Sequence, residues 1–429
     1  MTALLLVLLA LGLVGNARIG LFILNRAVFK TREEKGDPMR WLLITIPPAL
    51  LLLTSLYWFA WKEAREDHLS GLGLAGWIWA LLTGAVGLYW IIDRALHNWN
   101  EVQTPGTRTL GSEVIRLRKA HIPFASLRRL GAHNDLYDLE ISSHEVIVHD
   151  LDPAFHGYRI AFLTDTHVAS FMRRGFYREC VDQVRRAEPD LILLGGDFVS
   201  FRRHIPLMAE LLLTGLEARD GVWAVLGNHD YWSDPDGVVA AMTSRGVRFI
   251  VNRSVQIRRD GATMDLVGID EVYRGRPDLE AAFANADGKR PCLALSHHPD
   301  IVLRMDGRRV DLLVCGHTHG GQIRLPFFGP LVVPSKHEGR YAAGFHLEHG
   351  VRMYVSRGLG SIPPIRILCR PEIPIFTLVK NQGLGTRGQG LGNGNTNPVI
   401  LSERRAERAI DEAAGASEGS PNGRIEPQG

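Results

Sequence analysis

The chain has 429 residues, 45% of them hydrophobic, and a formal net charge of +3. A charge this small gives no basis for a nucleic-acid partner, and the length predicts two or three structural units. The four cysteines are far apart and form no CxxC pair, which argues against a zinc ribbon or a disulfide framework and favours reduced thiols in the cytosol.

Three apolar segments in the first hundred residues are the first predicted elements. They cover Ala3–Leu24, Trp41–Trp61 and Leu72–Ile92. Each would be about 30 Å long as a helix, enough to cross a bilayer. We therefore expect residues 1–97 to form a membrane domain with about three transmembrane helices. A cleaved signal peptide is the alternative for the first segment, although no basic stretch precedes Ala3.

Basic residues predict the orientation of these segments. The first loop holds Arg26, Lys30, Arg32, Lys35 and Arg40, whereas the second holds Lys62 and Arg65. Because loops rich in Lys and Arg stay on the cytoplasmic side, the first loop is predicted to be cytoplasmic. Three spans then place everything after Ile92 in the cytoplasm, at a cell inner membrane.

The rest of the chain divides into three parts by its pattern. Residues 98–157 are predicted to be a linker with a first strand at Leu139–Val148. Residues 158–380 alternate between strands and helices, which predicts an α/β domain with its site at the carboxyl ends of the strands. Residues 381–429, rich in Gly, Asn and Ser, are expected to be a disordered tail.

The expected elements of this α/β domain follow one another closely. The strands are Arg159–Thr164, Asp190–Leu194, Val222–Leu226, Arg248–Val251, Met264–Ile269, Cys292–Leu295 and Leu312–Cys315, and the helices are Gly175–Ala187, Leu207–Leu216 and Asp236–Ser244. Short apolar runs without polar alternation predict strands that are buried on both faces.

Polar residues follow five of these strands directly. They are Asp165 and His167, then Asp197, then Asn228, His229 and Asp230, then His297 and His298, and finally His317 and His319. Any one of them could cap a helix or form a turn. Together at five strand ends, imidazoles, carboxylates and a carboxamide favour a site for first-row divalent metals, since Mg²⁺ or Ca²⁺ would call for oxygen ligands only.

The motifs D-x-H, GGD, GNHD, SHHP and GHTHGGQ, in this order, resemble the calcineurin-like metallophosphoesterase superfamily. The resemblance covers Tyr158–Leu378. The later stretch YVSRGLGSIPPIRILCRPEI, residues 354–373, is similar to the membrane-associated bacterial branch. The resemblance implies two packed, mixed β-sheets flanked by helices, following the N-terminal transmembrane helices.

The resemblance also implies a centre of two divalent metal ions, Mn, Fe or Zn. One ion would be held by Asp165, His167, Asp197 and His319, and the other by Asp197, Asn228, His297 and His317. Asp197 would bridge ions about 3.5–4 Å apart, and a water between them would become the attacking hydroxide. His229 resembles the catalytic histidine beside the leaving group, and His298 occupies a position that is not a ligand.

The expected function is therefore a membrane-anchored phosphoesterase that hydrolyses a phosphoester or pyrophosphate bond. One alternative is hydrolysis of a lipid-linked pyrophosphate of the UDP-diacylglucosamine type, and another is a non-catalytic membrane scaffold or sensor on the same fold. Arg357, Arg366 and Arg370 could bind a second phosphate or a lipid head group. Equally, they could be salt-bridge partners of neighbouring loops.

Overall fold

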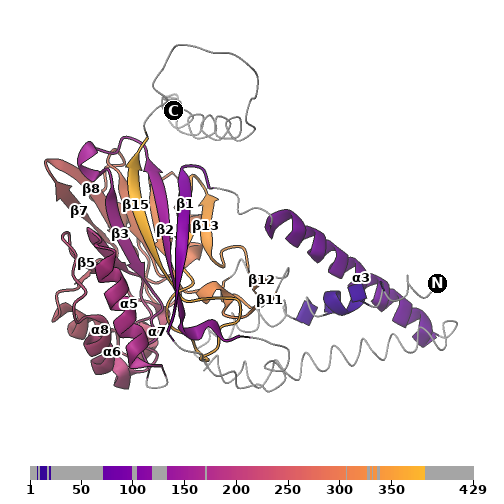
Figure 1. Cartoon of the computed structure of the whole chain (residues 1–429). Helices are drawn as coiled ribbons and strands as arrows, with labels where there is room; N and C mark the ends of the chain where they lie inside the picture. The colour runs from indigo at the N-terminus through magenta and orange to yellow at the C-terminus, as the bar shows by residue number, and fades with distance from the viewer. Residues whose placement is uncertain are drawn as a thin grey trace, which may run out of the picture.

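The computed structural model describes residues 71–98, 104–117, 133–169, 172–305, 307–325, 329–330, 332–335 and 339–381, with short helical stretches before position 21. The third apolar segment forms α3 (Gly71–Asn98), whose side chains are described from Trp77 to Ile92 (Figure 1). Ala3–Leu24 is described only in part, while Trp41–Trp61 and residues 382–429 lie outside the described residues. Over the described part, no helix is both long and apolar enough to cross a membrane.

Two mixed sheets form the body of the protein (Figure 1). The seven-stranded sheet has the order β1 (Thr107–Arg116), β2 (Asp138–Val148), β15 (Glu372–Lys380), β3 (Tyr158–Leu163), β4 (Leu191–Leu194), β5 (Val222–Ala224), β6 (Arg248–Phe249). The six-stranded sheet has the order β13 (Gly344–Glu348), β14 (Val351–Val355), β10 (Leu312–Cys315), β9 (Cys292–Leu295), β8 (Ala262–Gly268), β7 (Arg253–Arg259). A small hairpin joins β11 (Arg324–Leu325) and β12 (Gly329–Pro330).

The two sheets pack face to face because their strands are apolar on both sides. On β3, Ile160 and Phe162 point into the core between the sheets, where they join Leu266 of β8 and Leu293 of β9. The alternate residues of β3 point to the opposite face of the sheet, as the two-residue period of a strand requires. The predicted α/β class and the two packed mixed sheets are confirmed.

Helices cover the outer face of the seven-stranded sheet. They are α5 (Arg174–Arg186), α6 (Ile205–Leu212) and α8 (Pro235–Thr243) (Figure 1). In α5 the buried residues Phe176, Cys180 and Val184 recur every four positions, which gives one apolar stripe toward the sheet. The outer face of the six-stranded sheet packs against α9 (Leu279–Phe283) and the short helix Pro299–Arg304.

Two strands of the larger sheet come from unexpected parts of the chain. β1 lies within residues 98–157, where the sequence predicted a linker and only one strand, and it pairs with β2 in antiparallel fashion. β15, near the end of the described chain, lies between β2 and β3, parallel to the first and antiparallel to the second. The segment before the predicted α/β region and the end of that region therefore pair with each other in one sheet.

Candidate metal centre

The loops that carry the predicted residues converge because their strands run parallel. β3, β4 and β5 are parallel neighbours in one sheet, and β8, β9 and β10 are parallel neighbours in the other. Parallel strands bring their carboxyl ends to the same edge. Three groups of side chains there place their ligand atoms close enough to hold a metal ion: Asp165, His167 and His319; His167, Asp197 and His229; Asp197, His297 and His317.

The first group is built from the loops after β3 and β10. Nε2 of His167 lies 3.1 Å from Nε2 of His319, and Nε2 of His319 lies 3.5 Å from Oδ1 of Asp165. All three residues are buried. Two imidazole nitrogens and a carboxylate oxygen therefore face one point from which water is largely excluded.

The group around His297, here called the second group, consists of Asn228, His297 and His317 and is built from the loops after β5, β9 and β10. Nε2 of His297 lies 3.1 Å from Oδ1 of Asn228 and 3.0 Å from Nδ1 of His317. Oδ2 of Asp197 lies 3.4 Å from Nε2 of His297 and 3.5 Å from Nε2 of His167. The carboxylate of Asp197 thus stands between the two groups, at nearly equal distances from each.

The outer ring nitrogens show which inner nitrogens carry lone pairs. Nδ1 of His297 is 2.8 Å from the carbonyl oxygen of Gly195, and Nε2 of His317 is 2.9 Å from the carbonyl oxygen of Pro334. A carbonyl can only accept, so in the neutral rings these nitrogens carry the protons, and the inner nitrogens face each other with lone pairs. Between two neutral rings such a pair is repulsive unless a cation, either a metal ion or a proton on one ring, lies between them, and carbonyl partners of this kind also orient histidines that bind metals.

The spacing of the donor atoms also fits a transition metal. Two ligands about 2.0–2.1 Å from one ion stand about 3.0–3.4 Å apart, close to the spacings found in both groups. The residues present therefore suit bound cations with nitrogen and oxygen ligands.

Five of the predicted ligands sit in a backbone conformation that is costly for residues other than glycine. Asp165, His167, Asp197, His317 and His319 have φ values of 53°, 42°, 55°, 73° and 52°. Each residue of this kind costs of order 1–3 kcal/mol, which is tolerated where the surrounding structure fixes it. This concentration of backbone strain at one sheet edge marks the edge as the functional part of the molecule.

Two glycines leave room for the carboxylates. A Cβ on Gly227 would lie 2.2 Å from Oδ1 of Asp197, and one on Gly316 would lie 2.2 Å from Oδ2 of Asp165. No side chain fits at either position while these carboxylates keep their places.

Asp230 holds two of the loops together, a role that its position in the sequence did not reveal. Its carboxylate accepts backbone N–H bonds from Asp197 (2.8 Å), Phe198 (2.9 Å), Val199 (3.4 Å) and Gly227 (2.9 Å). The side chain is fully buried, and burial raises its pKa to about 7, helped by the nearby Asp197. Asp230 therefore fixes the backbone around the central carboxylate.

His229 and His298 lie next to the two groups. The backbone N–H of His229 donates to Oδ1 of Asp197 (2.7 Å), and its half-buried ring packs edge-on against His167 with ring centres 4.7 Å apart. The ring of His298 lies 4.0 Å from that of His317, and its Nδ1 accepts the backbone N–H of Asp300. His298 thus packs behind a predicted ligand.

The charged side chains of the centre lie close enough to shift one another's pKa values. Burial opposes protonation of His297, yet the adjacent Asp197 carboxylate raises the pKa of His297 to about 10. Burial alone would raise the pKa of Asp197, but His297 and the other histidines hold this pKa well below its usual range. Burial raises the pKa of Asp165 to about 6. A buried carboxylate such as Asp197 keeps its negative charge only beside a compensating cation.

The proposed anion-binding role of Arg366 is wrong. This side chain is fully buried, and its guanidinium donates to the carbonyl oxygens of Arg357 (2.8 Å), Gly358 (3.3 Å), Gly360 and Cys369 (3.4 Å). All four acceptors belong to the segment before β15. Arg366 therefore holds that segment in shape and is not available to a phosphate.

Arg357 and Arg370 point to acidic side chains of the larger sheet. Arg357 forms ion pairs with Glu372 and, at 3.2 Å, with Glu140, and Arg370 lies 4.0 Å from Glu140. The alternative prediction, that these arginines form salt bridges, describes them better, although their partners lie in strands β2 and β15 and not in loops.

Replacing Arg366 by Ala is expected to lower the free energy of unfolding by about 3 kcal/mol or more, because several buried carbonyls lose their donor. Arg370→Ala is the matched control, since that side chain is 39% exposed and its loss is expected to change stability by about 0.5 kcal/mol or less. Denaturant unfolding of both variants measures the difference. Equal stabilities would show that the Arg366 bonds contribute little.

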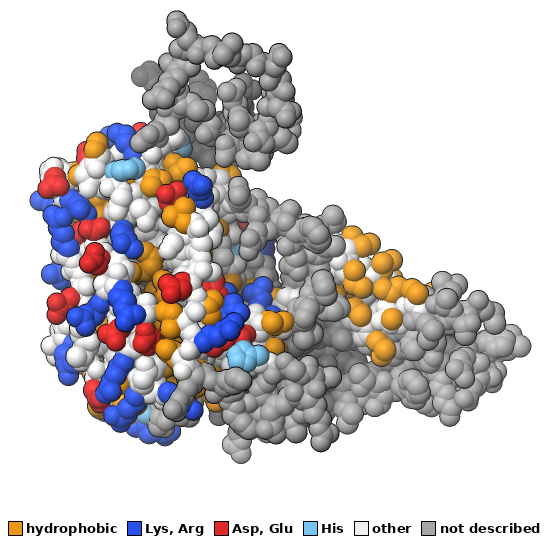
Figure 2. Space-filling view, viewed as in Figure 1, with side chains coloured by type: hydrophobic (Ala, Val, Ile, Leu, Met, Phe, Trp, Pro, Cys, Tyr) orange, Lys and Arg blue, Asp and Glu red, His pale blue; other side chains and the backbone are white. Residues whose placement is uncertain are grey.

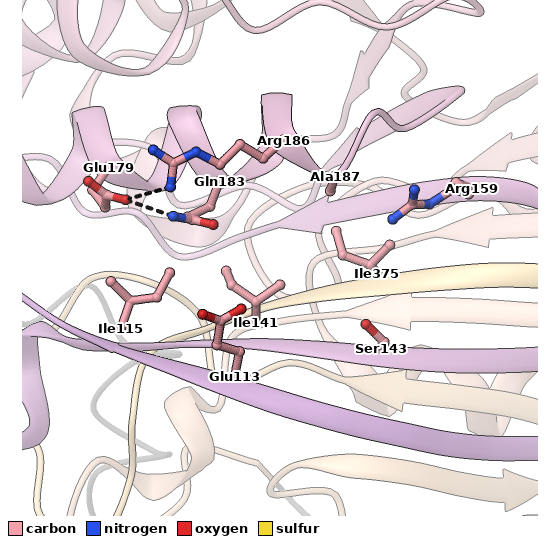
Figure 3. A pocket seen from close by; sticks show the side chains of 10 residues that line it. All are labelled: Glu113, Ile115, Ile141, Ser143, Arg159, Glu179, Gln183, Arg186, Ala187 and Ile375. Atoms are coloured by element: carbon pink, nitrogen blue, oxygen red, sulfur yellow. Dashed lines mark hydrogen bonds and ion pairs between the residues drawn. The ribbon is translucent and has the colours of Figure 1, made fainter.

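A separate groove of about 510 Å³ lies between α5 and the strands β1, β2, β15 and β3 of the larger sheet (Figure 3). Its floor is apolar, formed by Ile141 and Ile375, and its rim carries Glu179, which contacts Gln183 and Arg186. None of the residues at the strand ends lines this groove.

Comparisons with known proteins agree with the geometry. The family model for calcineurin-like phosphoesterases matches residues 158–321. The uncharacterized metallophosphoesterase YkuE of Bacillus subtilis is 29% identical over 247 residues, which covers 56% of this chain and 85% of the relative. The phosphodiesterase YaeI of Escherichia coli is 31% identical over 226 residues, which covers 52% of this chain and 82% of the relative.

A third relative comes from cattle. The transmembrane protein with metallophosphoesterase domain of Bos taurus is 30% identical over 251 residues, which covers 54% of this chain and 55% of the relative. Because YaeI is matched over most of its length at this identity, and the family model matches the region that carries the strand-end motifs, the chain belongs to the calcineurin-like phosphoesterase family and is a metal-dependent phosphoesterase.

Proposed function

We propose that two divalent metal ions, Mn, Fe or Zn, bind at the strand ends and that Asp197 bridges them. One ion is held by Asp165, His167, Asp197 and His319, and the other by Asp197, Asn228, His297 and His317. The observation that carries this proposal is the position of the Asp197 carboxylate, 3.5 Å from His167 on one side and 3.4 Å from His297 on the other.

When bound, the two ions would neutralise the phosphoryl oxygens and lower the pKa of a water so that it can attack phosphorus. Residues of the chain position the ligands and donate the proton. Asp230 keeps the Asp197 loop in place, and the carbonyls of Gly195 and Pro334 keep the lone pairs of His297 and His317 directed inward. His229, half-buried at the open side of the first group, donates a proton to the departing oxygen.

The substrate we propose is a phosphodiester or a pyrophosphate. The name of the relative YaeI, a phosphodiesterase, supports a diester. A purified, metal-reconstituted protein should hydrolyse members of these two classes in a screen that also includes phosphomonoesters and nucleotide-lipid pyrophosphates. Turnover of phosphomonoesters alone would contradict the proposal. Failure with every substrate in the presence of bound metal would favour the scaffold or sensor alternative.

We further propose that the N-terminal part anchors the enzyme to a membrane. Figure 2 shows hydrophobic side chains on the surface of α3, and Ile78, Leu82 and Tyr89 are 51%, 59% and 70% exposed. Apolar surface of this kind is typical of a segment that contacts lipid or another protein. An anchor would place the site beside an amphiphilic substrate, which is why a lipid-linked pyrophosphate stays an alternative.

The catalytic domain is expected to face the cytoplasm. Alkaline phosphatase is active only outside the cytoplasmic membrane, so its fusion after Asn98 should be inactive, whereas a fusion in the second loop, after Lys62, should be active. The reason is the excess of Lys and Arg in the first loop. Activity of the fusion after Asn98 would show that the orientation or the number of spans is wrong.

A further inference from the structure

A row of rings and one cation leads outward from the first metal group. The ring of His229 lies 4.7 Å from that of His167 and 4.6 Å from the ring of Trp232. The guanidinium carbon of Arg274 lies 5.3 Å from the centre of the Trp232 ring. The side chain of Trp232 is 37% exposed, so the outer end of this row is open to solvent.

The loop that carries Arg274 is fixed to the helix that carries Trp232. This loop follows β8, and the helix is α7 (Asn228–Ser233). The hydroxyl of Tyr231 donates to Oδ1 of Asp270 (2.6 Å), and Glu271 accepts the backbone N–H groups of Tyr273 (2.8 Å) and Arg274. The base of the Arg274 side chain is therefore held in place beside the indole.

The guanidinium of Arg274 forms no ion pair with a carboxylate among the described residues, and it lies over the ring of Trp232. A guanidinium offers five N–H donors in a planar fork that matches the oxygens of a phosphate, and stacking on an aromatic face leaves those donors free at its edge. A half-buried, pre-positioned cation of this kind is suited to bind an oxyanion.

We propose that Trp232 and Arg274 form a subsite for a second phosphoryl group on the leaving part of the substrate. The subsite favours diphosphate diesters over monophosphate diesters. This inference rests on the proposed function of the metal centre and on the place of His229 beside the departing oxygen. A second phosphate would extend from the centre past His229 to the fork of Arg274.

The test compares two ligands that differ by one phosphate. Diadenosine diphosphate and diadenosine monophosphate carry the same two nucleosides and differ only in the number of phosphates between them. Binding of the non-hydrolysable methylene analogue of the diphosphate is measured by calorimetry on the full, metal-loaded chain. Arg274→Ala is expected to weaken this binding by about 10- to 100-fold, the usual effect of losing a hydrogen bond to a charged group.

Arg276→Ala is the matched control, because Arg276 is an exposed arginine of the same loop and its loss is expected to change binding by about twofold at most. In turnover, Arg274→Ala should lower the ratio of kcat/KM for the diphosphate to kcat/KM for the monophosphate by a similar 10- to 100-fold. Metal content should equal that of the parent protein.

The outcomes separate this inference from the function on which it rests. Binding that depends on Arg274 without hydrolysis of either compound would support the subsite and contradict the proposed reaction. Unchanged binding of the diphosphate analogue in Arg274→Ala would overturn the subsite whether or not the protein hydrolyses the compounds, and so would an equal loss of kcat/KM for both.

Discussion

Asp197→Asn is expected to lose metal from both sites and to lose at least about 10³-fold in activity, because each bound ion contributes several kcal/mol to stabilising the transition state. One carboxylate oxygen of Asp197 faces His167 and His297 at once, and the other accepts the N–H of His229. An amide keeps the size of this group, but it carries no negative charge, so its oxygen holds two cations far more weakly than the carboxylate oxygen does.

The measurement is metal content per chain after dialysis, together with turnover of a diester. Asp165→Asn is the one-site comparison, since Asp165 contacts His319 and lies outside the His297 group. It should lower the occupancy of one site and leave more metal bound than Asp197→Asn does. Full occupancy of two sites in Asp197→Asn would rule out the bridging assignment.

His229→Ala is expected to keep both metals and to slow turnover by about 10²–10⁴-fold, the usual contribution of general acid catalysis. The backbone N–H of His229, not its ring, contacts Asp197, so alanine preserves that hydrogen bond. The ring is half-buried and faces His167 edge-on, on the open side of the centre. Removing it should affect proton transfer more than metal binding.

Leaving groups distinguish acid catalysis from substrate positioning. The loss in His229→Ala should shrink for a nitrophenyl ester, because nitrophenolate leaves without being protonated. His319→Ala should instead weaken metal binding and reduce turnover of every substrate alike. If His229→Ala slowed good and poor leaving groups equally, with metal content unchanged, phosphate positioning would be the better account of His229.

The strand ends could be predicted from the sequence because the signal is local. A short apolar run that stops at a glycine or a polar residue, as in Leu312–Cys315 before Gly316, marks both the strand and its end. Parallel packing then brings those ends together, so Asp165, Asp197 and His317 meet although they are far apart in the chain. The same logic predicted the α/β class, whereas the two packed sheets were implied by the resemblance to the calcineurin-like superfamily.

Other features depend on contacts that no local pattern records. Asp230 is one of several polar residues at strand ends in the sequence, yet it binds backbone groups of another loop, and Arg366 was predicted to be a phosphate-binding or salt-bridging arginine although it is fully buried. The place of β15 between β2 and β3 is set by pairing over more than two hundred residues. Such pairings follow from packing of the whole domain, not from periodicity.

The central place of β15 sets the order in which the protein can be completed during synthesis. β2 and β3 are consecutive strands, but they are held apart by a strand that the ribosome makes last among those described. Until Glu372–Lys380 has left the exit tunnel, the nascent chain exposes the flanks of both strands, and Phe376 and Leu378 are missing from the core between the sheets. Unpaired strand flanks invite wrong pairing, so the larger sheet of the growing chain can close only after β15 has emerged.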